Sequence, residues 1–150
     1  MDTGGAVAYA VQQLHLKGNF LITNADTWIG TGVQEVARSA APSMAVLSLR
    51  DASRYGQVQF SDEFFVTSFS EKTSSQGLGW INAGLCHLNA DFFSNWDGQP
   101  FSLERISFPA LAGRGVLKAV PIQTDFIDIG IPQDYLSFCG WIESGKENEL

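Results

Sequence analysis

The chain has 150 residues, of which 45% are hydrophobic, and its nine basic and sixteen acidic residues give a formal net charge of -7. This length suits one domain with a sizeable core, so we expect a single domain over residues 1–150. The acidic charge argues against a polyanion and excludes nucleic acid as the main partner. A small phosphorylated ligand stays compatible with this charge, because backbone donors or a metal ion can hold its phosphate.

Neither a membrane segment nor a zinc site is indicated by the sequence. No uninterrupted apolar run approaches the ~20 residues that cross a bilayer, which predicts no transmembrane helix and no membrane partner. The first residues place no basic segment ahead of an apolar one, unlike a secretory signal, so we expect a cytoplasmic protein. Cys86 and Cys139 form no CxxC pair and have no histidine at a zinc-ligand spacing. Both are predicted to be ordinary buried residues.

The first half of the chain alternates between helical and strand patterns. Apolar residues at a helical spacing predict a helix over residues 5–15, which opens after a Thr-Gly-Gly turn. Residues 20–22 are apolar on both faces of a strand, which is typical of the inside of an α/β sheet. A helix over residues 33–40 and a buried strand over residues 44–49 follow.

The second half adds a hairpin and further short strands, so a mixed sheet is expected. Ser102 is the predicted N-cap of a helix, and a proline at residue 132 is predicted to open the last one. The remaining elements are a hairpin-like region at residues 55–69 and strands at residues 80–88, 116–120 and 126–129.

Two aspartates stand where a predicted strand gives way to a loop. Asp26 follows the strand at residues 20–22, and Asp128 ends the strand at residues 126–129, just before a glycine and a proline. Ligands of open α/β sheets usually bind at such edges, and Mg²⁺ typically takes one or two carboxylates. Each aspartate alone is also typical of a turn or a helix cap, so the pattern by itself leaves both readings open.

Seven segments occur in an order and spacing that resemble the sugar-1-phosphate nucleotidyltransferases. They are TGGAVAYA, NADTW, SRYGQV, SFSEK, INAGLCHL, PFSLERISFP and FIDIGIPQDY. The last four are most similar to the branch that makes GDP-heptose and GDP-mannose. The resemblance runs from residue 1 to about residue 141 and depends on the ordered set. It implies an α/β, Rossmann-like fold with a mixed, mainly parallel sheet flanked by helices.

The resemblance also implies roles for particular residues. Asp26 and Asp128 match the positions that bind the catalytic Mg²⁺, while the oxygen of a sugar 1-phosphate attacks the α-phosphorus of a nucleotide. The positions assigned to substrate are Thr3, Gly4, Gly5, Tyr55, Gly56, Glu71, Lys72, Asn82 and Gly84. Without the resemblance, Glu71 and Lys72 suit a solvated strand end, and the glycines suit turns or bulges.

In one respect the 150 residues depart from the family pattern. They contain no G-G-x-G-T-R-L segment, whose backbone amides and arginine hold the nucleotide phosphates in the family, and Asp2 stands where a glycine is usual. We therefore expect an N-terminally truncated domain that keeps the sugar-phosphate and metal residues and shows no transferase activity alone. The alternatives are an active subunit completed by another polypeptide and a non-catalytic, self-associating remnant.

The strand at residues 20–22 also leads to an expectation about assembly. The family pairs the equivalent strand with the one that carries the glycine-rich loop. Residues 20–22 offer no charge or proline to block association with another chain. A homodimer or a higher symmetric oligomer is therefore expected.

Overall fold

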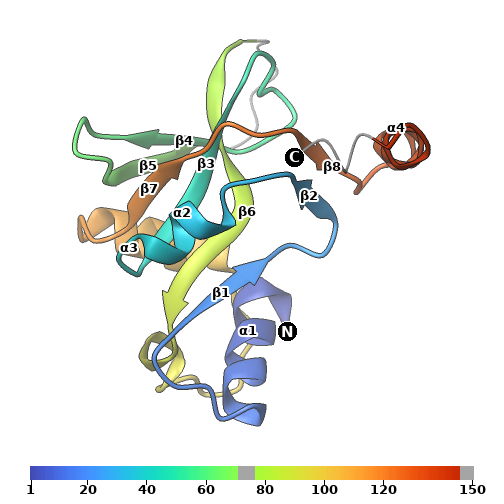
Figure 1. Ribbon diagram of the computed structural model, residues 1–150. Coiled ribbons are helices and arrows are strands. Elements are labelled where there is room, and N and C mark those ends of the chain that lie inside the picture. Colours follow the sequence, from blue (N-terminus) through green and yellow to red (C-terminus); the bar gives the residue numbers. More distant parts are fainter. Residues whose placement is uncertain (71–76, 146–150) are drawn as a thin grey trace.

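The computed structural model describes residues 1–70 and 77–145. Its main sheet has six strands, in the order β5-β4-β6-β3-β7 with β1 also paired to β6, and β2 and β8 form a separate two-stranded sheet (Figure 1). The elements are α1 (Asp2–Gln13), β1 (Asn19–Thr23), β2 (Thr27–Ile29), α2 (Val33–Arg38), β3 (Ser43–Leu49), β4 (Gln57–Phe60), β5 (Val66–Ser70), β6 (Gly79–Asn89), η1 (Ala90–Phe93), η2 (Leu103–Ser107), α3 (Phe108–Gly113), β7 (Lys118–Pro121), β8 (Phe126–Asp128) and α4 (Pro132–Glu143).

The α/β class and the mixed sheet are confirmed, but the expectation of mainly parallel pairing is wrong. Of the described strand pairs, only β3 with β7 is parallel. The reason is the position of β6. The strands β1 and β3 are linked through α2 and run in the same direction, yet β6 lies between them and runs the opposite way. Both of their ladders with β6 are therefore antiparallel.

Two apolar clusters cover the two faces of the sheet. Successive side chains of a strand point to opposite faces, and β3 follows this rule with Met44 and Val46 in one cluster and Ala45 and Leu47 in the other. The first five residues of β3 are fully buried. Burial on both faces explains why this strand reads as a continuous apolar run.

The first helix begins earlier than its sequence predicts. Gly4 and Gly5 lie inside the first turn of α1, and not in a turn before it. Both of their backbone amides donate to the carbonyl of Phe101, at 2.8 and 3.2 Å. The first amides of a helix have no partner within the helix, so this distant carbonyl lets α1 start at Asp2. A Cβ on Gly4 would overlap the Phe101 ring, which explains the glycine at this position.

Several local predictions are settled by the structure. Ser102 caps η2 by accepting a hydrogen bond from the amide of Arg105 at 3.1 Å, as predicted. Cys86 is buried as predicted, and its burial raises the pKa of the thiol. Cys139 lies on α4 and is partly exposed, so its predicted burial is wrong.

The last helix packs through aromatic contacts at one end of the molecule. The Trp28 ring on β2 lies 6.0 Å from the ring of Phe138 and 5.8 Å from that of Trp141, measured between centroids. No residue of α4 is fully buried, and the helix stands beside the main sheet in Figure 1. Within residues 1–70 and 77–145, no helix is both long and apolar enough to cross a membrane.

Candidate functional site

The two aspartates singled out by the sequence lie together. Thr27 pairs with Asp128 in the β2–β8 ladder, and the carbonyl of Asp26 accepts a hydrogen bond from the amide of Ile129 at 2.8 Å. The Asp128 carboxylate accepts a hydrogen bond from the amide of Gly130 at 2.9 Å. These backbone contacts hold Asp26 and Asp128 at one end of the small sheet.

Gly130 marks the point where the two carboxylates converge. A Cβ at this position would lie 3.0 Å from Oδ1 of Asp128 and 3.7 Å from Oδ2 of Asp26. Both oxygens therefore border the same small space, which only a residue without a side chain leaves open. Oxygen donors from two carboxylates suit Mg²⁺, whose shell is usually completed by water and substrate phosphate. Among the described residues, no group of three or more His, Cys, Asp or Glu side chains is placed so that it could hold a metal ion.

A cleft of about 440 Å³ begins beside Asp26. It is lined by residues of α1, β1, β6, η2 and α3 and of the loop after β1: Thr3, Val7, Ile22, Thr23, Asn24, Ala25, Asp26, Asn82, Gly84, Cys86, Leu103, Glu104 and Phe108. Asp26 belongs to this lining and also to the pair with Asp128. The cleft and the pair of carboxylates therefore form one continuous site.

The wall of the cleft on β6 has an unusual backbone. Gly84 has a φ of +77°, a region that residues with a side chain rarely adopt. The carbonyl of Gly84 accepts a hydrogen bond from the amide of Asn24 at 2.9 Å, and its own amide donates to Oδ1 of Asn82 at 3.0 Å. A Cβ on Gly84 would lie 2.9 Å from Nδ2 of Asn24. Asn82 also lines the cleft, and among the described residues none accepts a hydrogen bond from its NH₂ group.

Tyr55, on the loop before β4, contacts the strand that ends at Asp128. Its ring packs edge-on against Phe126 of β8, with centroids 5.8 Å apart. Burial raises the pKa of the Tyr55 hydroxyl. Arg54 opposes this shift, while the nearby charges of Asp128 and Asp134 add to it. The raised pKa favours the neutral form of the Tyr55 hydroxyl, which can donate a hydrogen bond. Gly56 follows it directly and is exposed.

An ion pair fixes this loop to the last helix. The guanidinium of Arg54 lies 2.6 Å from the carboxylate of Asp134 in the first turn of α4, and the pKa of Arg54 is raised mainly by this hydrogen bond. Sequence reasoning missed this pair. Its signal was available, because Arg54 stands in SRYGQV and Asp134 in FIDIGIPQDY.

Only some of the other predicted binding residues line the cleft. Thr3 lines the cleft, where its hydroxyl donates to Glu104 at 2.7 Å and accepts from the amide of Leu103 at 3.0 Å. Gly4 and Gly5 do not line the cleft, and their amides are used by Phe101. Their assignment to substrate stays a prediction. Glu71 and Lys72 lie outside the described residues.

Comparisons with known proteins identify relatives of the chain. The sequence model of the family described as nucleotidyl transferase matches residues 1–139. The D-glycero-alpha-D-manno-heptose 1-phosphate guanylyltransferase of Campylobacter jejuni is 30% identical over 144 residues, which cover 92% of this chain and 62% of that protein. The mannose-1-phosphate guanylyltransferase catalytic subunit beta of Xenopus tropicalis is 27% identical over 98% of this chain and 43% of its own length.

A solved structure extends the likeness to the fold. HddC from Yersinia pseudotuberculosis, crystallised in complex with GMP-PN, superposes with a TM-score of 0.80 and 30% identity over 94% of this chain and 62% of that one. The chain thus spans about three fifths or less of the length of these relatives. The expected Rossmann-like architecture is the one that its structural neighbours share. The chain belongs to the nucleotidyl transferase family.

Proposed function

We propose that these 150 residues form the sugar-phosphate and metal side of a sugar-1-phosphate nucleotidyltransferase site. The observation that carries the proposal is the convergence of Asp26 and Asp128 around Gly130, together with the place of Asp26 in the lining of the cleft. The relatives named above are guanylyltransferases of heptose 1-phosphate and mannose 1-phosphate, which supports a sugar 1-phosphate as the ligand.

The cleft has the size and the polar groups that such a ligand needs. Its volume of about 440 Å³ lies within the usual range for small-molecule sites, roughly 300–1,000 Å³. The NH₂ of Asn82, which has no partner in residues 1–70 and 77–145, can donate to a sugar hydroxyl, and the bare backbone at Gly84 lets the sugar ring approach closely. Apolar side chains such as Ile22 and Phe108 complete the wall.

The carboxylates provide the place for the phosphate end of the ligand. Mg²⁺ held by Asp26 and Asp128 would neutralise phosphate charge during transfer. The Tyr55 hydroxyl, whose pKa is raised by burial, can donate a hydrogen bond to a phosphate or sugar oxygen. The ion pair between Arg54 and Asp134 fixes the Tyr55 loop to α4, which follows β8.

We further propose that the 150-residue chain does not transfer a nucleotidyl group by itself. The described lining of the cleft contains the carboxylates Asp26 and Glu104 but no lysine or arginine. A nucleoside triphosphate needs several positive charges or amide donors around its phosphates. The 150 residues also lack the glycine-rich segment that supplies these donors in the family.

Calorimetric titration with mannose 1-phosphate in the presence of Mg²⁺ tests the acceptor site. We expect saturable binding that weakens about tenfold in Asn82→Ala, because one hydrogen bond to a sugar hydroxyl is lost. Asn95→Ala removes an exposed amide that does not line the cleft and should bind normally. Equal binding by both variants would contradict the assigned site. Separately, metal-dependent pyrophosphate release from GTP and mannose 1-phosphate by the chain alone would contradict the proposed lack of transfer.

A further inference from the structure

A second groove lies away from the two carboxylates. It has a volume of about 870 Å³ and is lined by the loop before β3, the residue before β5, the end of β6, η1, the end of α3 and the start of β7. None of its lining comes from α1 or β1, and it shares no residue with the cleft beside Asp26. In Figure 1, α3 and β7 lie on the opposite side of the molecule from α4. The groove is therefore separate from the candidate site.

Two basic residues line this groove without an acidic partner. Arg114 follows α3 and is exposed, whereas Lys118 opens β7 and is partly buried, with its Nζ 4.7 Å from the centroid of the Phe65 ring. Among residues 1–70 and 77–145, no carboxylate forms an ion pair with either of them. The chain has nine basic and sixteen acidic residues. Two unpaired cations in one groove therefore create a local positive site on an acidic protein.

The rest of the groove is largely apolar and includes two aromatic rings. Phe65 carries the Lys118 ammonium over its ring, and Phe92 of η1 is 40% exposed. One carboxylate, that of Asp91, also belongs to the lining. A ligand that suits these residues has negative charge for the two cations and a flat ring for the aromatic wall. The volume of about 870 Å³ holds both parts, since small-molecule sites usually measure roughly 300–1,000 Å³.

We propose that this groove binds a nucleoside phosphate. The phosphate pairs with Arg114 and Lys118, because guanidinium and ammonium groups form strong charge-assisted hydrogen bonds with phosphate oxygens. The base stacks on the exposed ring of Phe92. Stacking of this kind tolerates any base, since every base has a flat face, so AMP and GMP should bind alike. The inference does not depend on the proposed function, because the groove uses neither Asp26 nor Asp128.

A nuclear magnetic resonance titration with GMP locates the binding site. It is carried out without divalent metal ions, so that no metal on the two carboxylates can draw GMP to the cleft. GMP should shift the backbone amide signals of Gly115 and Val116 in a saturable way and leave those of Asn82 and Gly84 unchanged. Guanosine and inorganic phosphate should each bind at least about tenfold more weakly, because each lacks half of the contacts. Shifts confined to Asn82 and Gly84, or phosphate binding as tight as that of GMP, would overturn the proposal.

Two exposed charges of opposite sign in the groove provide the variants. Arg114→Ala should weaken GMP binding at least about tenfold, because a charge-assisted pair is lost. Asp91→Asn should strengthen it several-fold, because it removes a carboxylate that repels the phosphate. Arg38→Ala is the matched control, since this exposed arginine of α2 lies outside the groove.

The affinities of these variants for GMP decide the proposal. Equal affinity of Arg114→Ala and Arg38→Ala, or weaker binding by Asp91→Asn, would refute it. If Arg114→Ala fails to fold by circular dichroism, the Asp91→Asn variant and the titration decide alone.

Discussion

Asp26 and Asp128 are 102 positions apart in sequence, yet Oδ2 of the first and Oδ1 of the second border the same point, where Gly130 lacks a Cβ. The three-residue ladder between β2 and β8 creates this arrangement. It brings a loop that follows β1 to the segment that opens α4. The candidate metal site therefore depends on a small sheet outside the main one.

Gly130→Ala should weaken metal binding without unfolding the protein. The added methyl group would lie 3.0 Å from Oδ1 of Asp128 and push that carboxylate away from Asp26. Displacing a ligand in this way is expected to cost roughly tenfold in Mn²⁺ affinity, measurable by titration calorimetry. Gly113→Ala adds the same group where no atom lies within 4 Å. Gly113→Ala should therefore bind Mn²⁺ with normal affinity, and equal affinity of the two variants would contradict the role given to Gly130.

Gly84→Ala should reduce both stability and binding of mannose 1-phosphate. Its φ of +77° disfavours any side chain, and the new Cβ would lie 2.9 Å from Nδ2 of Asn24. We expect the free energy of unfolding in urea to fall by about 1–3 kcal/mol. Gly140→Ala places a methyl group in open space on α4 and should not lower stability. A stable Gly84→Ala variant with unchanged binding would show that the backbone at this position does not shape the cleft.

The ion pair between Arg54 and Asp134 should matter more for ligand binding than for stability. The Arg54 side chain is 50% exposed, so the pair should contribute about 1 kcal/mol or less to the free energy of unfolding. A double-mutant cycle with Arg54→Ala and Asp134→Ala measures this coupling. Both variants should also bind mannose 1-phosphate several-fold more weakly, because they release the Tyr55 loop. If the variants lost well over about 1 kcal/mol of stability but still bound mannose 1-phosphate normally, the ion pair would serve stability and not ligand binding.

Asp2 should contribute to stability only at moderate and high pH. A hydrogen bond from the amide of Thr3, assisted by Arg105, lowers the pKa of the Asp2 carboxyl below its ordinary value of 3.8. The folded state therefore binds this proton less readily than the unfolded state. The contribution is present above about pH 4 and is lost as the pH falls through the lower, folded-state pKa. The free energies of unfolding in urea of the wild type and of Asp2→Asn should thus differ at pH 6 and become equal in strong acid. If the difference in free energy of unfolding stayed constant from pH 6 to strong acid, the charged Asp2 carboxylate would not be the source of this stability.

The sequence predicted local features of the fold better than its long-range pairings. The helices, the hairpin and the Ser102 cap were recognisable because their signals lie within a few residues. The relative directions of the strands in the main sheet were not recognisable, because they depend on β6 lying between β1 and β3. The start of α1 was also missed, since Gly4 and Gly5 are held by the carbonyl of Phe101, far along the chain.

The residues of the candidate site were likewise easier to predict than the contacts between them. Both aspartates could be named from the ends of their strands and from the family resemblance. The resemblance also implied that the two carboxylates lie close together, whereas the ladder that brings them together gave no signal, because β2 is too short to show a periodic pattern. The contact of Arg54 with Asp134 joins a loop to the first turn of α4, 80 positions further along the chain, and depends on where α4 begins.

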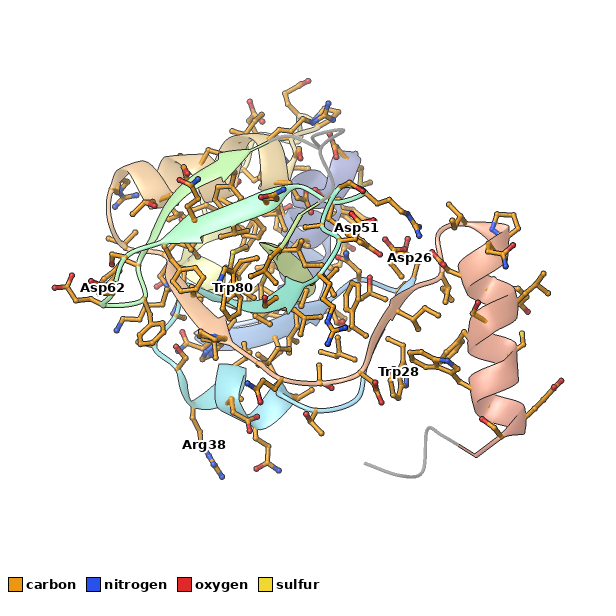
Figure 2. The ribbon with its side chains drawn as sticks, turned by 90° about the horizontal axis from the view of Figure 1, so that it is seen from above. Asp26, Trp28, Arg38, Asp51, Asp62 and Trp80 are labelled. Atoms are coloured by element: carbon orange, nitrogen blue, oxygen red, sulfur yellow. The ribbon has the colours of Figure 1, made fainter. Side chains whose placement is uncertain are left out.

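The most direct test of the central claim counts metal ions on the two carboxylates. Electron paramagnetic resonance of Mn²⁺, with saturating mannose 1-phosphate, should show one bound ion per chain for the wild type. Asp26→Asn and Asp128→Asn should each reduce the affinity at least about tenfold. Asp62→Asn is the control, since Asp62 lies on the far side of the molecule from Asp26 (Figure 2). It should bind Mn²⁺ as the wild type does. Wild-type Mn²⁺ affinity in Asp26→Asn and Asp128→Asn would show that the two carboxylates do not share an ion.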